Sequence, residues 1–290
     1  MIQRCYLEIT NRCNLHCTFC PGCDRVPERM DAERFELLTD RLQGKVRFLY
    51  FHLMGEPLLH PLLTQFICRA REKGFVPVLT TNGTLLAHRP ELVAARPYKV
   101  QISLHALSGL PEVDHPRYIS EVATYARAAA ETGTLVILRL WNLTDESSAS
   151  TSVQNTLWLD ELSHYLPRPW KERPDGWRLA NNIYVEYDRQ FAWPDATMPE
   201  LSKDHLCSAL RTQVGVLVDG TVVPCCLDSE GTLALGNLCE QSLPDILQSG
   251  RAQALYDGFS RHEPCEELCR RCGYAAQTRQ YHTRHTENKE

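Results

Sequence analysis

The stretch Cys13–Cys20, with the sequence CNLHCTFC, places three cysteines in one short segment at the spacing C-x3-C-x2-C. Three thiolates on one loop can hold three irons of a [4Fe–4S] cube, which leaves the fourth iron without a protein ligand. A cluster that only carries electrons is normally closed by four cysteines, so an open iron favours chemistry at the metal. Cys-x2-Cys pairs also bind zinc, and on the triplet alone a zinc site stays open.

The neighbours of this triplet resemble those of the radical S-adenosylmethionine (SAM) superfamily. Phe19 stands before the last cysteine, where that family usually carries an aromatic, and we count it with the cofactor-binding residues. The resemblance implies that Cys13, Cys17 and Cys20 ligate a [4Fe–4S] cluster whose open iron chelates SAM. One-electron reduction of SAM then gives methionine and a 5′-deoxyadenosyl radical, which removes a hydrogen atom from the substrate.

Composition narrows the class of protein. The chain has 290 residues, of which 43% are hydrophobic, enough for one large domain and a smaller one. Its net charge of −5 gives no general case for binding nucleic acid or acidic membranes. No run of about eighteen apolar residues predicts a membrane span. Thirteen cysteines without a recognisable secretion signal favour reduced, metal-ligating thiols, so we expect a cytoplasmic protein.

Alternating strand and helix patterns fill the first half of the chain. Strands are expected at residues 6–10, 46–53, 75–81, 100–104, 135–140 and 183–187, with helices at 31–44, 61–74 and 120–132. Repeating βα units give a parallel sheet, and six units are too few for a closed eight-stranded barrel. We therefore predict an α/β protein with a partial (β/α)6 barrel at 1–190. A small C-terminal iron–sulfur domain, a β-hairpin plus helices, would occupy 191–290.

The resemblance extends to five polar or glycine positions near the ends of predicted strands, where barrel enzymes gather their functional groups: Gly55, Glu56, Asn82, Ser103 and Arg139. The sequence MGEP at 54–57 stands where the family has a Gly-Gly-Glu-type motif whose backbone carbonyls bind the SAM ammonium. Ser103 would bind the ribose hydroxyls, Asn82 would line the pocket, and Arg139 would meet the SAM carboxylate. The alternatives are an ordinary turn at 55–57, a turn or helix cap at Asn82, and a structural carboxylate partner for Arg139.

A second group of cysteines lies in the last third of the chain: Cys207, Cys225, Cys226, Cys239, Cys265, Cys269 and Cys272. Asp219-Gly220 between β-rich runs predicts a hairpin, and a Pro-Cys-Cys sequence follows it. A lone cysteine, this hairpin, a Leu-Gly-Asn and a final Cys-x2-Cys occur in the order of the SPASM/twitch domain. The resemblance covers about residues 205–275, and that domain binds auxiliary [4Fe–4S] clusters.

The resemblance implies that four of these cysteines close one auxiliary [4Fe–4S] cluster. The four that we choose are Cys207, Cys225, Cys269 and Cys272. No cysteine follows Cys272, whereas the two-cluster pattern continues with further cysteines, so we expect one auxiliary cluster. The other three thiols would be small buried residues. A zinc site on the C-terminal cysteines is the alternative for this domain.

The implied activity is that of a radical SAM oxidoreductase. An auxiliary cluster can accept the electron left on a substrate radical, which fits dehydrogenation of an alcohol or amino sugar, or oxidative maturation of a peptide. A redox-neutral epimerase, an iron–sulfur electron carrier and a zinc-stabilised nucleic-acid-binding protein are the alternatives. Expected partners are SAM, a reductant such as flavodoxin or ferredoxin, and the substrate. Because the sequence starts at its first expected strand, a peptide-recognition domain would be a separate protein.

Three further regions carry predictions of their own. Residues 143–180 are rich in Ser, Thr, Pro and Trp, and we expect an irregular insertion or active-site cover there. His105 is expected to be a hydrogen-bonded barrel histidine rather than a substrate contact. The basic tail at 279–285 is expected to be a frayed, solvated terminus rather than a phosphate or RNA contact.

Overall fold

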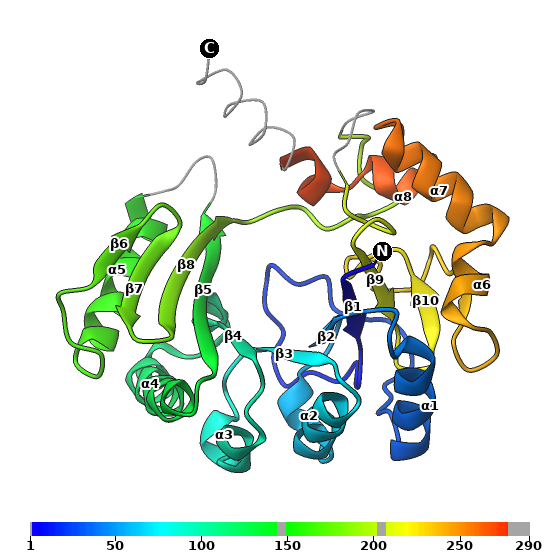
Figure 1. Ribbon diagram of the computed structural model, residues 1–290. Helices are drawn as coiled ribbons and strands as arrows, with labels where there is room; N and C mark the ends of the chain where they lie inside the picture. Colours follow the sequence, from blue (N-terminus) through cyan, green and yellow to red (C-terminus); the bar gives the residue numbers. More distant parts are fainter. Residues whose placement is uncertain (1, 144–148, 202–206, 278–290) are drawn as a thin grey trace.

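The computed structural model describes residues 2–143, 149–201 and 207–277, and Figure 1 shows their arrangement. The strands are β1 (Arg4–Leu7), β2 (Phe48–Phe51), β3 (Val76–Thr81), β4 (Lys99–Ser103), β5 (Leu135–Leu143), β6 (Lys171–Arg173), β7 (Gly176–Ala180), β8 (Ile183–Arg189), β9 (Gln213–Val216), β10 (Thr221–Val223) and β11 (Gly236–Asn237). The helices are α1 (Ala32–Leu42), α2 (Leu63–Glu72), α3 (Glu91–Ala95), α4 (His115–Glu131), α5 (Ala149–Ser163), α6 (Leu243–Leu247), α7 (Gly250–Ser260) and α8 (Glu267–Arg270). The basic tail at 279–285 lies outside the described residues.

One sheet runs through all the described parts of the chain. Its eleven strands follow the order β11-β10-β9-β1-β2-β3-β4-β5-β8-β7-β6. The neighbours from β9 to β8 are parallel, and each end of the sheet finishes in antiparallel strands. In Figure 1 the sheet forms an open arch, with α1 to α4 on its outer side and the loop that follows β1 inside it.

The six parallel strands predicted from the sequence are present as β1, β2, β3, β4, β5 and β8, which confirms the partial (β/α)6 barrel. One set of alternate side chains, which includes Leu7, Phe51 and Leu138, is fully buried in the core. The other set points to the opposite face, inside the arch, because successive side chains of a strand alternate. The carboxyl ends of these strands lie at one edge of the arch, where a barrel places its site.

Most of the predicted helices are also present. Asp31 caps α1 by accepting a hydrogen bond from the Arg34 amide, and Phe35, Leu38 and Leu42 are buried as the apolar stripe predicts. The second helix starts later than expected, at Leu63, and α4 starts earlier than expected. The five-residue helix α3 was not predicted, since it is too short for its apolar period to be visible.

The prediction of an irregular insertion at 143–180 is wrong for the described part of that segment. Helix α5 packs on α4 and buries Trp158 and Leu162, while β6 and β7 form a hairpin that joins β8. The segment therefore lengthens the sheet at one edge. Its Ser- and Thr-rich sequence hid the helix because tertiary packing, and not local propensity, decides such a segment.

The predicted C-terminal hairpin is present and is continuous with the barrel sheet. β9 pairs in parallel with β1, and β10 returns beside β9 after the turn at Asp219-Gly220. Gly220 has φ +92°, the left-handed conformation that glycine adopts without strain, and Asp219 accepts a hydrogen bond from the Thr221 amide. The sheet thus crosses the boundary predicted at residue 190. No described helix is long and apolar enough to cross a membrane.

Candidate active site and metal centres

The three cysteines of the N-terminal triplet lie on the loop that leaves the carboxyl end of β1. Cys13 and Cys20 are exposed, Cys17 is half-buried, and all three thiols are free. The Cys20 amide donates to the Cys17 carbonyl at 3.0 Å and closes the turn between them. Burial, followed by the nearby Cys13 and Cys20, raises the pKa of Cys17 to about 11. Three accessible, neighbouring thiols on one loop are a donor set that fits a cluster with one open iron.

Gly55 lets the turn after β2 pack directly against this loop. Its φ is +73°, and a Cβ atom at this position would lie 2.4 Å from the Thr10 carbonyl oxygen and 2.8 Å from that of Arg12. The Glu56 amide donates to the same Arg12 oxygen at 2.8 Å. The glycine of the MGEP sequence is therefore required by a close backbone approach that holds the start of the cysteine loop.

The Glu56 carboxylate is occupied by hydrogen bonds from within the protein. It is 2% exposed and accepts hydrogen bonds from the Thr81 hydroxyl at 2.6 Å, the Asn82 amide at 2.7 Å and the Leu58 amide at 2.9 Å. Burial raises its pKa to about 7, against the lowering effect of those hydrogen bonds. Glu56 thus joins the end of β2 to the end of β3, and a ligand contact from this residue would come from its backbone.

Asn82 supports the cysteine loop from the end of β3. Its side-chain nitrogen donates to the Asn14 side-chain oxygen at 3.0 Å and lies 4.0 Å from the Cys13 sulfur. Its side-chain oxygen accepts from the amide and the hydroxyl of Thr84. Asn82 therefore forms the turn that was one of its predicted roles, and it also lies beside the cysteine loop.

Ser103 and Arg139 lie side by side as register partners, Ser103 at the carboxyl end of β4 and Arg139 in the middle of β5. Arg139 is only 8% exposed, and its Nε atom has no hydrogen-bond partner among the residues that the structure describes. The guanidinium carbon stacks 3.8 Å above the Trp141 ring. Burial lowers the pKa of Arg139 to about 10, so the group stays charged at neutral pH. A buried cation with an unpaired donor fits an anionic ligand.

His105 connects this part of the barrel to the cysteine loop. Its ring packs on Phe19 with centroids 4.7 Å apart, and its Nδ1 donates to the Arg139 carbonyl at 2.9 Å. Burial lowers its pKa to about 4, so the ring is neutral at physiological pH. The prediction of a hydrogen-bonded barrel histidine is confirmed. Trp193 fixes the other side of the motif by donating to the Phe19 carbonyl at 3.0 Å.

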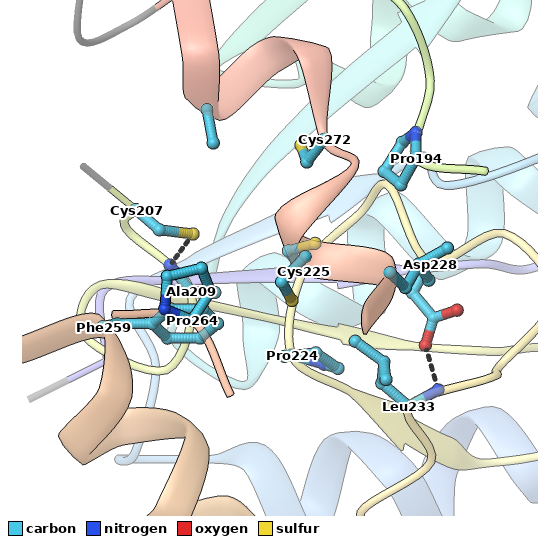
Figure 2. A pocket seen from close by; sticks show the side chains of 13 residues that line it. Pro194, Cys207, Ala209, Pro224, Cys225, Asp228, Leu233, Phe259, Pro264 and Cys272 are labelled. Carbon is cyan, nitrogen blue, oxygen red and sulfur yellow. Dashed lines mark hydrogen bonds between the residues drawn. The ribbon is translucent and has the colours of Figure 1, made fainter. Parts of the chain in front are cut away.

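The four C-terminal cysteines chosen from the sequence line one pocket, shown in Figure 2: Cys207, Cys225, Cys269 and Cys272. The rest of the lining is mostly apolar and includes Pro224, Phe259 and Leu268. Burial raises the pKa of Cys272 to about 11. Among the described residues, no three Cys, His, Asp or Glu side chains are close enough together to bind one metal ion. The four thiols are therefore spaced around the pocket. Four free thiols around one apolar pocket are a donor set that fits a cluster with four protein ligands.

The other three C-terminal cysteines lie outside this pocket lining. Cys226 packs with Leu53 and Met54 on the barrel side. Cys239 lies near the hairpin turn, with its sulfur 3.7 Å from the Asp219 carbonyl oxygen. The expectation that all three are buried is wrong: Cys265 is exposed and the other two are half-buried. Cys265 is at the surface because it precedes α8, whereas the cysteines inside and after α8 turn inward.

A buried ion pair that the sequence did not predict ties the C-terminal hairpin to the cysteine loop. Glu8, 1% exposed, accepts hydrogen bonds from Arg25 at 2.8 and 2.7 Å and from the Met54 and Val218 amides at 3.2 Å. Arg25 also donates to the Ser229 carbonyl at 2.8 Å. The one signal in the sequence was a lone carboxylate in the apolar strand YLEIT.

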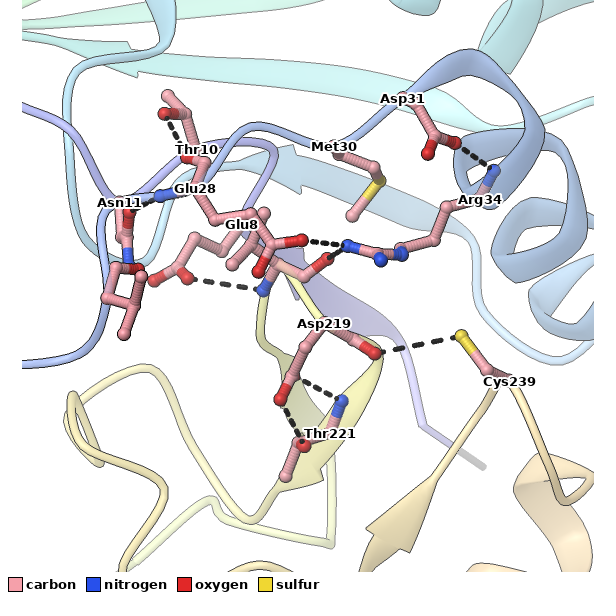
Figure 3. A network of polar contacts seen from close by, with 12 residues as sticks. Glu8, Thr10, Asn11, Glu28, Met30, Asp31, Arg34, Asp219, Thr221 and Cys239 are labelled. Atoms are coloured by element: carbon pink, nitrogen blue, oxygen red, sulfur yellow. Dashed lines mark hydrogen bonds and ion pairs between the residues drawn. The ribbon is translucent and has the colours of Figure 1, made fainter.

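A second set of polar contacts strengthens the same junction (Figure 3). Arg34 of α1 donates to the Val218 carbonyl at 3.0 Å and forms an ion pair with Glu28. The adjacent turn residue Asp219 carries the contacts to Thr221 and Cys239. The hairpin and the barrel are therefore held at one fixed junction by contacts from both sides.

Two stretches of the chain match family models. Residues 7–131 match the radical SAM superfamily, and residues 207–273 match SPASM, an iron–sulfur cluster-binding domain. Among curated proteins, the chain is 36% identical over 85 residues to a tungsten-containing aldehyde ferredoxin oxidoreductase cofactor-modifying protein of Pyrococcus furiosus. That match covers 28% of this chain and 24% of the relative.

Other relatives match over most of the chain. An S-adenosyl-L-methionine-dependent 2-deoxy-scyllo-inosamine dehydrogenase of Niallia circulans is 22% identical over 283 residues, which is 92% of this chain and 90% of that protein. The fold resembles the crystal structure of BtrN in complex with AdoMet and 2-DOIA, with a TM-score of 0.56, 18% identity and coverage of 94% and 93%. It also resembles Streptococcus suis SuiB bound to precursor peptide SuiA, with a TM-score of 0.61, 14% identity and coverage of 95% and 70%.

The two family matches agree with the two cysteine sites. The radical SAM match contains the triplet and the strand ends around it, and the SPASM match contains the four cysteines of the pocket. The cofactors of these domains are [4Fe–4S] clusters and SAM, and the donor sets described above fit them. The chain belongs to the radical SAM superfamily and is an enzyme that uses SAM and carries a SPASM domain.

Proposed function

We propose that this enzyme is an oxidoreductase that dehydrogenates an alcohol carbon of a small polar molecule. The observation that carries the proposal is the second cysteine site: four thiols in one apolar pocket, separate from the open triplet. A closed cluster there gives the substrate radical an electron acceptor, which a net oxidation needs and an epimerisation does not. The match over 92% of the chain to a protein described as a SAM-dependent dehydrogenase supports this choice.

We assign Cys13, Cys17 and Cys20 to the SAM-binding cluster, and the four pocket cysteines to one auxiliary cluster. When bound, the two clusters and SAM would supply a 5′-deoxyadenosyl radical that takes one hydrogen atom from the alcohol carbon and an acceptor for the remaining electron, while the hydroxyl proton is released to solvent. Gly55 and Asn82 hold the cysteine loop at the strand ends, through the close backbone approach and the Asn14 contact described above.

The chain's own polar groups then hold SAM. Arg139 binds the SAM carboxylate with the donor that is unpaired in the structure, and Trp141 fixes the plane of the guanidinium. Ser103, its register partner, binds the ribose hydroxyls. Phe19 and His105 form an aromatic pair that closes the space between the cysteine loop and β5 and keeps water from it.

The proposal is tested by anaerobic turnover. The enzyme is reconstituted with iron and sulfide, reduced chemically or with flavodoxin, and incubated with SAM and a panel of small alcohols. We expect 5′-deoxyadenosine together with a ketone or aldehyde product that has lost two hydrogen atoms, both identified by mass spectrometry. A product of unchanged mass and inverted configuration would replace the oxidation with a redox-neutral epimerisation. A colourless protein that contains zinc would exclude both.

A peptide is the second candidate substrate. The fold likeness to SuiB bound to a precursor peptide covers 95% of this chain but 70% of that one, so the peptide-bound neighbour is the longer protein. Oxidative maturation of a peptide would use the same two cysteine sites, with a separate protein delivering the peptide. Substrate-dependent 5′-deoxyadenosine formation with a peptide encoded near the gene, and none with small alcohols, would favour this candidate.

A further inference from the structure

Glu186 lies next to Arg139 inside the arch of the sheet. The register of β4, β5 and β8 places Ser103, Arg139 and Glu186 in one row across three neighbouring strands. The residues that precede the last two, Leu138 and Val185, are fully buried in the core under the helices. Since side chains alternate along a strand, Arg139 and Glu186 face the opposite side, toward the site.

The two charged groups are neighbours, and each favours the charged form of the other, but they are not in direct contact. Neither an ion pair nor a hydrogen bond joins them, and the half-buried Glu186 carboxylate makes no hydrogen bond or ion pair with any residue that the structure describes. Burial, followed by the nearby Asp175, raises the pKa of Glu186. A partly buried carboxylate without donors costs free energy unless a ligand supplies them.

The strand on the other side of Glu186 leaves this carboxylate uncovered. Its register partner on β7 is Gly176, which brings no side chain beside it. Gly176 has φ +146°, and a Cβ atom there would lie 2.2 Å from the Val185 carbonyl oxygen, so no larger residue fits. Asp188, two residues along the same face of β8, is exposed and adds a second negative charge toward the mouth of the site.

We propose that Glu186 binds an ammonium group of the substrate, so that the substrate is an amine-bearing alcohol. The inference rests on the proposed function, because it needs Arg139 to be occupied by the SAM carboxylate. With Arg139 neutralised in that way, Glu186 and Asp188 offer two carboxylates to the substrate, and the cations that remain near Glu186 are Lys99 and Arg173, neither of which forms an ion pair with it. An ammonium group satisfies the free carboxylate with charge-assisted hydrogen bonds, whereas a substrate carboxylate would be repelled.

The test measures binding to the SAM-loaded, oxidised holoenzyme, in which no turnover occurs. The probes are 2-deoxy-scyllo-inosamine and the matching cyclitol with a hydroxyl in place of the amine, and titration calorimetry gives both dissociation constants. We expect the amine to bind about ten- to a hundred-fold more tightly, the effect of one charge-assisted hydrogen bond. Glu186→Gln should remove this preference with SAM affinity unchanged, and Glu186→Asp should keep part of it. Glu172→Gln, which alters an exposed carboxylate on β6, is the matched control and should behave like the parent.

The outcomes separate the inference from the function on which it rests. If the parent binds both probes alike, binds neither or prefers the cyclitol, the amine assignment is overturned, even where turnover still yields an oxidised alcohol. If Glu186→Gln weakens SAM binding as much as Arg139→Ala does, Glu186 is the structural partner of Arg139 and the assignment is also overturned. An intact amine preference with an unoxidised product would instead contradict the proposed dehydrogenation.

Discussion

The two cysteine sites place the same side chain in opposite surroundings. The triplet occupies one eight-residue loop, and two of its three thiols are exposed at the open edge of the barrel. The pocket cysteines come from three separated segments, are half-buried and face an apolar space. An exposed incomplete donor set gives a small molecule access to iron, and a complete set of four thiolates leaves no iron open. Access to the iron therefore separates a site for chemistry from a site that only accepts an electron.

The largest expected effect comes from removing the triplet. Replacing Cys13, Cys17 and Cys20 together with Ala should remove about four irons per chain and all SAM cleavage, because three thiolates hold one cube. The protein should stay folded, since the thiols are on a loop and contribute little to the core. Iron content and 5′-deoxyadenosine are measured anaerobically. Cys265→Ala, which alters an exposed thiol outside both sites, is the control. Retained SAM cleavage in the triple variant would show that the triplet does not hold the SAM-binding cluster.

Removing two of the pocket cysteines should affect the auxiliary iron and leave SAM cleavage intact. The Cys269→Ala, Cys272→Ala double variant should lose the auxiliary iron and still cleave SAM, because the triplet is intact. It should form no oxidised product, and its thermal unfolding should shift to lower temperature, since metal bound only by the folded state stabilises it. Full product yield from a variant shown to hold one cluster would make the pocket site purely structural.

A glycine pair tests how the open loop is held. Gly55→Ala puts a methyl group 2.4 Å from a backbone oxygen of the loop, so we expect most of the SAM-binding cluster to be lost while the auxiliary iron stays. Gly44→Ala is the matched control, because it has a similar φ of +71° but nothing within 4 Å of its added Cβ. It should cost only about 1 kcal/mol of stability and no iron. Equal iron loss in both variants would show that backbone strain, and not loop packing, was responsible.

The open site could be predicted from sequence because it is local. Eight residues carry its ligands, and the strands around it are continuous apolar runs, which parallel sheets require. The four pocket cysteines were chosen from the order of motifs, and the structure places them in one pocket lining. Whether they bind iron stays a prediction until the variants are measured.

The contacts around the sites could not be predicted because their partners are distant in sequence. Glu8 appeared only as a lone charge in a strand, and its partner Arg25 lies on a loop without a pattern of its own. Glu186 sits in the alternating stretch IYVEYDR, which is typical of a strand with a solvated face. Only the register with Arg139 shows that this face is turned toward the site.

Arg139 tests the ligand side of the open site. Arg139→Ala should weaken SAM binding by about ten- to a hundred-fold, the effect of one charge-assisted hydrogen bond, with iron content unchanged. Ser103→Ala should weaken it less, because it removes a neutral hydrogen bond. The exposed Arg127→Ala on α4 is the control. Parent-like SAM affinity in both site variants would place the SAM polar contacts elsewhere in the barrel.

A pH dependence of stability is expected at Glu56, which connects the end of β3 to the start of the cysteine loop. Burial raises its folded-state pKa to about 7 from 4.5, so the folded protein holds a proton that the unfolded chain has lost across that range. Stability linked to this group is therefore fully present below about pH 4.5 and is lost as the pH rises through about 7, by up to roughly 3 kcal/mol.

The contribution of Glu56 to the pH dependence of stability is isolated by comparing the thermal unfolding midpoints of the parent and Glu56→Gln at about pH 5 and about pH 8. Glutamine does not ionise, and its single side-chain oxygen can replace only one of the two carboxylate oxygens that accept from the Asn82 and Leu58 amides. The comparison therefore uses the change of each midpoint with pH and not the absolute midpoints. The unfolding midpoint of the parent should therefore fall further between about pH 5 and about pH 8 than the midpoint of the variant. Equal losses would mean that the three hydrogen bonds hold the carboxylate ionised at both pH values. The loop would then rest on a charged carboxylate, as the hairpin junction does on Glu8.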